Sequence, residues 1–165
     1  MIPKVLFIIN PKAGTPKKRK IRKELETAEE NFTGLKAVTT EYPGHAGELI
    51  KKHPDYNLYV AVGGDGTVNE VASEIAGTDK ILYAIPSGSG NGFAREMNYS
   101  AKPGKFLDRL HSTKTKKIDI IRLNDKLSIN IAGLGFDAEV AHLYAGNKKR
   151  GFWPYAVSCM KVFFR

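Results

Sequence analysis

The segment after the apolar run at residues 58–62 combines the residue types that bind phosphate: Gly63-Gly64-Asp65-Gly66-Thr67-Val68-Asn69-Glu70. Glycines let the backbone adopt positive φ and approach a ligand closely, and the free N–H groups at the start of a helix attract anions. Asp65 would repel a bare phosphate. The loop therefore favours either a metal ion between the carboxylate and the phosphates or a hydrogen bond to a hydroxyl group.

A purely structural turn is the alternative interpretation of this loop. Glycine and aspartate are common in turns, and Thr67 and Glu70 have the spacing of a capping box, in which Thr67 caps the helix and Glu70 returns to the Thr67 backbone. The cap does not explain glycines at 63, 64 and 66 together after a buried strand. We therefore favour a ligand-binding loop.

A second glycine-rich loop, residues 86–95, follows the next apolar run with the sequence Pro-Ser-Gly-Ser-Gly-Asn-Gly-Phe-Ala-Arg. Ser87 and Ser89 offer hydroxyl groups, and Arg95 on the following helix is placed to meet an anion. A flexible linker is the alternative, but linkers seldom lie between a buried strand and a helix. This loop is a second phosphate-binding candidate.

The elements that must position these loops alternate along the chain. Apolar runs predict strands at residues 5–9, 35–40, 58–62 and 81–85, and the intervening periodicity predicts helices at about 16–32, 45–53 and 68–76. This order indicates an α/β fold, a Rossmann-like parallel sheet with helices on both faces. Such sheets bind ligands beyond the carboxyl ends of their strands, so residues 10–14, by themselves an ordinary turn, become a third nucleotide contact.

The pattern changes after predicted helices at residues 92–97 and 103–112. Strands at 117–123 and 127–132, joined by Asn124-Asp125-Lys126, predict an antiparallel hairpin. We expect a nucleotide-binding α/β domain at residues 1–118 and the beginning of a truncated β-rich domain at 119–165. Because residues 152–165 are rich in aromatic side chains and end without a stop signal, we expect a piece of a longer polypeptide.

Composition limits the classes of function. The 165 residues are 42% hydrophobic and 26% charged, without an apolar run of about 18 to 20 residues or a signal-peptide pattern, which favours a cytosolic protein. One cysteine, Cys159, and four scattered histidines argue against an internal disulfide and a structural zinc site. The net charge of +9 suits nucleic acid, an anionic membrane or polyphosphate ligands.

The densest basic cluster, residues 17–23, lies on a predicted helix whose apolar positions Ile21, Leu25, Ala28 and Phe32 follow the helical period. A solvated basic face and attraction to anionic lipid or phosphate both fit it. Residues 133–138 match the G-x-G-x-x-A dinucleotide pattern, but no acid follows Glu139, so we do not expect a dinucleotide site.

With this spacing, residues 63–70 and 86–95 resemble the catalytic domain of the diacylglycerol kinase family, which includes bacterial lipid kinases and sphingosine kinases. Residues 10–14, 40–49 and 130–137 also fit that family's order. The Gly-Gly-Asp-Gly-Thr element alone is shared with NAD kinases and, more loosely, with phosphofructokinases. The Asn69-Glu70 continuation and the second loop favour the lipid kinases.

The resemblance implies an enzyme of lipid metabolism and phospholipid biosynthesis that transfers the γ-phosphate of ATP, with Mg²⁺, to a lipid hydroxyl such as that of diacylglycerol. It implies a cytoplasmic protein peripheral to the membrane, with the lipid substrate at the membrane surface and without a nucleic-acid partner. An NAD kinase and a non-catalytic nucleotide-binding module are the alternatives, and a homodimer stays open. Asp65 is the candidate metal ligand, and the implied ATP site comprises Asn10, Pro11, Lys12, Ala13, Gly14, Thr40, Gly64, Asp65, Gly66, Thr67, Val68, Asn69, Glu70 and Ser89.

The chain departs from the family pattern in two ways. Ser89 and Gly92 replace the family's usual threonine and aspartate; Ser89 keeps a hydroxyl, whereas the role of that aspartate is lost or supplied elsewhere. Family members also carry the general base and much of the lipid pocket in a later β-rich domain, so we expect no catalytic residue here. Because a base contributes roughly 10² to 10⁴ in rate, these residues alone should bind nucleotide weakly and phosphorylate lipid negligibly.

Overall fold

The computed structural model describes residues 3–13, 18–110, 112, 114–146 and 152–165. The chain divides into two compact units, Met1–Asn130 and Ile131–Arg165. The hairpin that was expected to open the second domain belongs to the first of these units. The division into functional domains stays a prediction.

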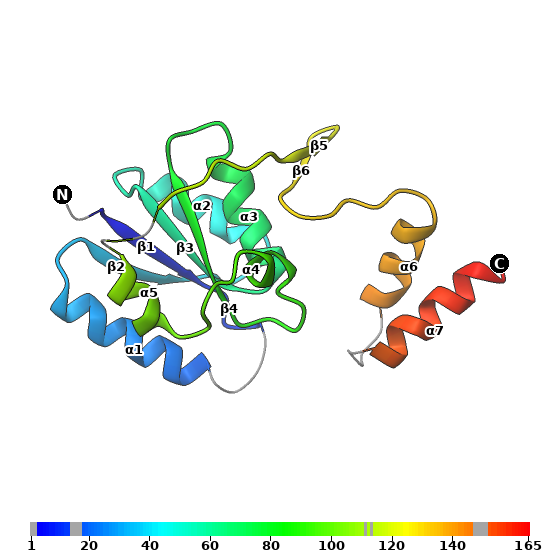
Figure 1. Cartoon of the computed structure of the whole chain (residues 1–165), viewed down its shortest axis with the longest axis horizontal. Helices are drawn as coiled ribbons and strands as arrows, with labels where there is room; N and C mark the ends of the chain where they lie inside the picture. Colours follow the sequence, from blue (N-terminus) through cyan, green and yellow to red (C-terminus); the bar gives the residue numbers. More distant parts are fainter. Residues whose placement is uncertain (1–2, 14–17, 111, 113, 147–151) are drawn as a thin grey trace. The chain divides into compact units, whose positions relative to one another are not determined.

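The first unit contains a four-stranded parallel sheet (Figure 1). Its strands are β1 (Val5–Ile9), β2 (Leu35–Thr39), β3 (Leu58–Gly63) and β4 (Ile81–Pro86), arranged in the order β2-β1-β3-β4. Every residue of β1 and β3 is buried, as expected for central strands covered on both sides. The predicted Rossmann-like parallel sheet is confirmed.

Helices cover both faces of this sheet (Figure 1). One face packs against α2 (His45–Lys52), α3 (Asp65–Ile75) and α4 (Gly92–Glu96), and the other against α1 (Lys18–Asn31) and α5 (Pro103–Arg109). Side chains alternate along β1, so Leu6 and Ile8 join the first core and Phe7 joins the second. The sheet is thereby held rigidly between two apolar layers.

Helix α1 packs on one face of the sheet through an apolar stripe. Ile21, Leu25 and Ala28 are buried as the periodicity predicts, but Phe32 lies beyond the end of the helix with 52% of its surface exposed. The expectation for Phe32 was wrong because the chain turns at residues 32–34, where Gly34 has φ of 90°. The helix period no longer applies once the helix has ended.

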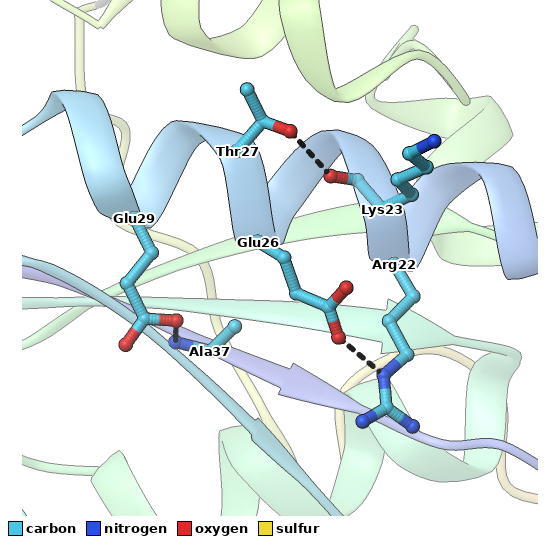
Figure 2. Close-up of polar contacts among 6 residues, drawn as sticks. All are labelled: Arg22, Lys23, Glu26, Thr27, Glu29 and Ala37. Carbon is cyan, nitrogen blue, oxygen red and sulfur yellow. Dashed lines mark hydrogen bonds and ion pairs between the residues drawn. The ribbon is translucent and has the colours of Figure 1, made fainter.

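Polar side chains of α1 make contacts along the helix and to β2 (Figure 2). Arg22 Nε donates to Glu26 Oε1 over 2.8 Å, but both side chains are more than half exposed, so this ion pair contributes little stability. Glu29 Oε2 accepts the backbone N–H of Ala37 over 3.3 Å. Because β2 is an edge strand, this contact satisfies a donor that has no neighbouring strand to bind.

The predicted hairpin is present but shorter than expected. β5 (Ile121–Leu123) and β6 (Lys126–Ser128) pair antiparallel, and Asn124 in the turn has φ of 52°. The second unit contains α6 (Phe136–Ala145) and α7 (Phe152–Phe163), helices that the sequence analysis did not predict. Within the described part of the chain, no helix has the length and apolar character needed to span a bilayer.

Candidate functional site

Four loops meet at the carboxyl edge of the parallel sheet. The strand register places Ile9 beside both Thr39 and Val62, and Gly63 beside Pro86. The residues that follow these strand ends are therefore neighbours at one edge: Asn10 after β1, Thr40 after β2, Gly64 after β3 and Ser87 after β4. The sequence prediction that the loops at residues 10, 63 and 86 emerge together is confirmed.

Asn10 connects the first of these loops to α3. Its Nδ2 donates to Thr67 Oγ1 over 3.0 Å, while its Oδ1 accepts the backbone N–H of Lys12 over 2.9 Å. The Asn10 N–H donates to the Val62 carbonyl over 2.9 Å. The asparagine is thus fixed at both its backbone and its side chain, and it fixes the Thr67 side chain, which is only 4% exposed.

Helix α3 begins at Asp65, three residues earlier than predicted. Gly64 is the N-cap, and the Val68 N–H donates to the Gly64 carbonyl over 3.1 Å. No side chain in the described part of the chain caps this end. The capping box considered for Thr67 and Glu70 is wrong, because Thr67 lies within the first turn and its hydroxyl oxygen accepts from Asn10.

The first turn of α3 consequently presents N–H groups at the edge of the sheet without a side-chain partner. The helix macrodipole adds a partial positive charge at the same point. Such a terminus suits an anion. This helix terminus lies at the same edge of the sheet as the loops that follow the neighbouring strands.

The two glycine loops touch each other through their backbones. A Cβ at Gly88 would lie 2.5 Å from Gly64 Cα, and one at Gly63 would collide with the Thr67 side chain. The Ser87 N–H donates to the Gly63 carbonyl over 2.9 Å, which continues the pairing of β3 with β4. Close packing therefore accounts for the glycines at 63, 64 and 88.

Gly66 differs from the other glycines of this loop. Apart from its two chain neighbours and the backbone of its own helix, no atom of the described residues lies within 4 Å of a Cβ built there, and Gly66 is not among the glycines with positive φ. Neither packing nor backbone conformation requires glycine at this position. Open space beside the first turn of α3 is what a ligand that approaches the N–H groups would need.

Asp65 joins the two loops through its carboxylate. Oδ1 accepts the Phe93 N–H over 3.2 Å, and a Cβ at Gly90 would lie 3.0 Å from Oδ2. Within the described ranges, no three His, Cys, Asp or Glu side chains form a group that could hold a metal ion. A carboxylate oxygen fits Mg²⁺, which usually binds through one or two carboxylates together with substrate phosphates.

The remaining predicted ATP-site residues fall into different environments. Thr40 is 6% exposed and its hydroxyl donates to the Ile9 carbonyl over 3.4 Å. The Val68 side chain lies in the core, so only its backbone is near the loops. Ser89 is exposed at the loop surface and Glu70 is half-buried in α3. Pro11 and Lys12 are exposed, Ala13 is half-buried, and Gly14 lies outside the described residues.

Asn69 is occupied by a contact that the sequence did not reveal. Its Nδ2 donates to the Leu127 carbonyl over 2.9 Å and its Oδ1 accepts the Ile129 N–H over 3.0 Å. The side chain thus binds the backbone of β6 at Leu127 and of the residue directly after β6, as a neighbouring strand would. These two hydrogen bonds give Asn69 a structural role within the loop and helix start at residues 63–70.

Two further residues of the second loop were absent from the predicted site. Asn91 adopts φ of 55° and its side chain both accepts from Gly88 N and donates to Gly88 O, which closes the loop. The Ser87 Oγ is buried without a hydrogen-bond partner among the described residues. The sequence signal for Asn91 was an asparagine between two glycines, because asparagine tolerates positive φ. The only sequence signal for Ser87 was its hydroxyl group.

Comparison with known proteins identifies the family of this site. Residues 4–123 match the family model of the diacylglycerol kinase catalytic domain. The chain belongs to this family. The resemblance inferred from the glycine loops is confirmed, and the site at the carboxyl edge of the sheet lies within the matched residues.

Individual relatives agree with this assignment. A Streptococcus pneumoniae protein, named provisionally as a lipid kinase, is 34% identical over 165 residues, which cover 96% of this chain and 56% of that protein. A diacylglycerol kinase of Staphylococcus carnosus is 30% identical over 155 residues, 91% of this chain and 51% of its own. The chain spans about half the length of these relatives.

A solved structure shares the architecture. The crystal structure of a diacylglycerol kinase from Bacillus anthracis strain Sterne superposes with a TM-score of 0.63 at 25% sequence identity, covering 76% of this chain and 47% of that one. The α/β arrangement described above is thus the arrangement found in the diacylglycerol kinase family.

Proposed function

We propose that this chain is the ATP-binding part of a lipid kinase that transfers the γ-phosphate of ATP to a lipid hydroxyl such as that of diacylglycerol. One observation carries the proposal: three loops converge on the first turn of α3, where no described side chain caps the helix. A nucleoside triphosphate is the anion that a kinase of this family would bind there.

The proposed phosphate contacts come chiefly from the backbone. The N–H groups of residues 65–67 in the first turn of α3 would donate to phosphate oxygens, the position of a side chain at Gly66 is open, and Asn10 holds the Thr67 side chain. Thr40 and residues 11–14 would contact the rest of the nucleotide from the neighbouring strand ends. The Asn69 and Val68 side chains have structural partners, so any part they play in the site is through the backbone.

Asp65 is the proposed ligand of Mg²⁺ that accompanies ATP, and the metal when bound would offset phosphate charge during transfer. Replacing Asp65 by asparagine keeps an oxygen that accepts the Phe93 N–H but removes the charge. We expect Asp65→Asn to keep the wild-type urea midpoint and to lose most of the dependence of ATP affinity on Mg²⁺. An unchanged magnesium dependence in calorimetric titrations would exclude this role.

The lipid substrate would be met at a membrane surface. The net charge of +9 favours an anionic bilayer or phosphate-rich ligands. We propose a peripheral protein of the cytoplasm that acts in phospholipid metabolism. None of the chain's residues is proposed as the general base, and the isolated chain is expected to phosphorylate lipid negligibly.

The deciding experiment supplies radiolabelled ATP to the full-length gene product with a panel of lipids and with NAD as acceptors. Label in a lipid with a free hydroxyl supports the proposal. Label in NAD but in no lipid would replace it with an NAD kinase, because both families share the Gly-Gly-Asp-Gly-Thr element. ATP binding in calorimetry without label in any acceptor would indicate a non-catalytic nucleotide-binding module.

A further inference from the structure

Gly92 lies at a point where a residue from a distant part of the same unit reaches the second glycine loop. A Cβ built on Gly92 would be 2.8 Å from Asn130 Nδ2 and 3.8 Å from Asp65 Oδ1. Gly92 is not among the residues with positive φ, so backbone conformation does not require glycine here. The absence of a side chain is what leaves room for the Asn130 carboxamide beside Asp65.

Asn130 is brought to this point by the contact that Asn69 makes. Asn69 holds the backbone at Leu127 and at Ile129, the residue directly before Asn130. Asn69 lies about one helical turn after Asp65 on α3. The helix that carries the phosphate-binding turn therefore also positions the segment that carries Asn130.

The Asn130 carboxamide has unused hydrogen-bonding capacity. The residue is exposed, and no side-chain hydrogen bond of Asn130 to another described residue is formed. An asparagine amide carries two N–H donors and one carbonyl acceptor. A phosphate that approaches beside the Asp65 carboxylate meets a negative charge. The Asn130 amide and the Asp65 carboxylate both lie within 4 Å of one point, the Cβ position of Gly92, so an amide donor there would offset part of that repulsion.

We propose that Asn130 is a phosphate-binding residue of the nucleotide site, and that Gly92 is a glycine because it admits the Asn130 side chain. The ligand is a phosphate group of ATP, so this inference rests on the proposed function. Residues 130–137 fit the family's order, but Asn130 was not among the expected ATP-site residues, and the fold brings it beside the second glycine loop. Asn69 acts as a positioning residue for it.

The test measures the affinity of the full-length gene product for ATP with Mg²⁺ by calorimetry. We expect Asn130→Ala to weaken binding about tenfold, the lower range for a hydrogen bond to a charged group. Asn130→Asp should weaken it further, because the isosteric carboxylate adds negative charge facing Asp65 and the phosphates. A residue that served only packing would not show this order.

Gly92→Ala tests the same contact from the other side. The methyl group of the new alanine would displace the Asn130 amide, so we expect Gly92→Ala to weaken ATP binding about as much as Asn130→Ala does. The double variant should bind ATP no more weakly than either single variant, because both substitutions remove the same contact. Gly104→Ala is the matched control, since its Cβ meets no described atom within 4 Å and it lies on α5, away from the loops. It should bind ATP like the wild type.

The outcomes separate this inference from the proposed function. Wild-type protein that binds ATP, with Asn130→Ala within twofold of it, overturns the role of Asn130 and leaves the kinase proposal standing. Asn130→Asp that binds as well as Asn130→Ala also overturns it, as does additive loss in the double variant. Wild-type protein that binds no ATP overturns both.

Discussion

Replacing Gly66 by alanine should separate folding from nucleotide binding. Gly66 lies in the first turn of α3, its Cβ would meet no described atom within 4 Å, and its φ is not positive. Alanine is favoured over glycine in a helix interior by roughly 0.8–1.0 kcal/mol, and less near a terminus. We therefore expect Gly66→Ala to raise the free energy of unfolding by up to about 1 kcal/mol, or the Tm by about 2–4 °C.

ATP affinity should move in the opposite direction. A phosphate oxygen that accepts a backbone N–H lies about 2.9 Å from the nitrogen, whereas a methyl carbon requires about 3.5 Å from its neighbours. The new methyl group would occupy the open space through which phosphate reaches the first turn. Loss of one hydrogen bond to a charged group corresponds to a roughly tenfold to hundredfold weaker Kd.

Urea unfolding and calorimetric titration with ATP and Mg²⁺ measure the two effects on the same protein. Gly104→Ala is again the control, because it is a helical glycine with the same open surroundings and should change ATP affinity by less than twofold. Undiminished ATP affinity in Gly66→Ala would refute the placement of phosphate at the first turn. A fall in stability would show that the fold itself needs glycine at 66.

Two further predictions concern packing and pH. Gly88→Ala would place a Cβ 2.5 Å from Gly64 Cα, about 1 Å closer than an ordinary carbon–carbon contact. We therefore expect the free energy of unfolding to fall by about 1–3 kcal/mol and ATP binding to weaken. An unchanged urea midpoint would contradict this expectation. Burial raises the pKa of Tyr83 and Tyr99 above 10.0, so the unfolded chain releases these protons first, and the free energy of unfolding should fall as pH rises above about 10. Phenolate absorbance of the folded protein checks this: ionisation of both tyrosines at pH 10 would contradict it.

The sheet could be predicted from the sequence because its signals are local. Strands buried on both faces, such as Val5–Ile9 and Leu58–Gly63, are continuous apolar runs, and helices of regular periodicity separate them. The helix starts were less well predicted. A Gly-Asp-Gly sequence is typical of a turn, yet α3 begins at Asp65, because the helix terminus is stabilised by the neighbouring loops and not by its own capping residue.

The sequence analysis did not predict helices α6 and α7. Residues 119–165 were expected to begin a β-rich domain and no helix was assigned after residue 112, whereas residues 136–145 and 152–163 are helical. The aromatic side chains Phe152, Trp153 and Phe163 are largely exposed within this unit, so a hydrophobic period gave no face to recognise.

Sequence spacing predicted only some of the residues that meet at the candidate site. Residues 10–14 and the two glycine loops were predicted together because each follows a strand of one parallel sheet, whereas Thr40 was implied by the family resemblance. Asn130 lies 60 residues after Glu70 and follows a hairpin. Its approach to Gly92 depends on the hydrogen bonds of Asn69 to the backbone of Leu127 in β6 and of Ile129. A contact that passes through a side chain and a backbone in succession leaves no periodic signal.

The glycines of the two loops, which are alike in sequence, have different physical reasons. Gly88 is required by the neighbouring backbone and Gly92 admits a distant side chain, whereas Gly66 faces only open space. Substitution by alanine should therefore weaken both folding and binding at Gly88, whereas at Gly66 and Gly92 it should weaken binding without weakening the fold. Because packing explains Gly88 without any ligand, only the other two positions bear on the nucleotide. A phosphate site at the first turn of α3 requires that the Gly66 variant lose ATP affinity while the protein stays folded, and the role of Asn130 requires the same of the Gly92 variant.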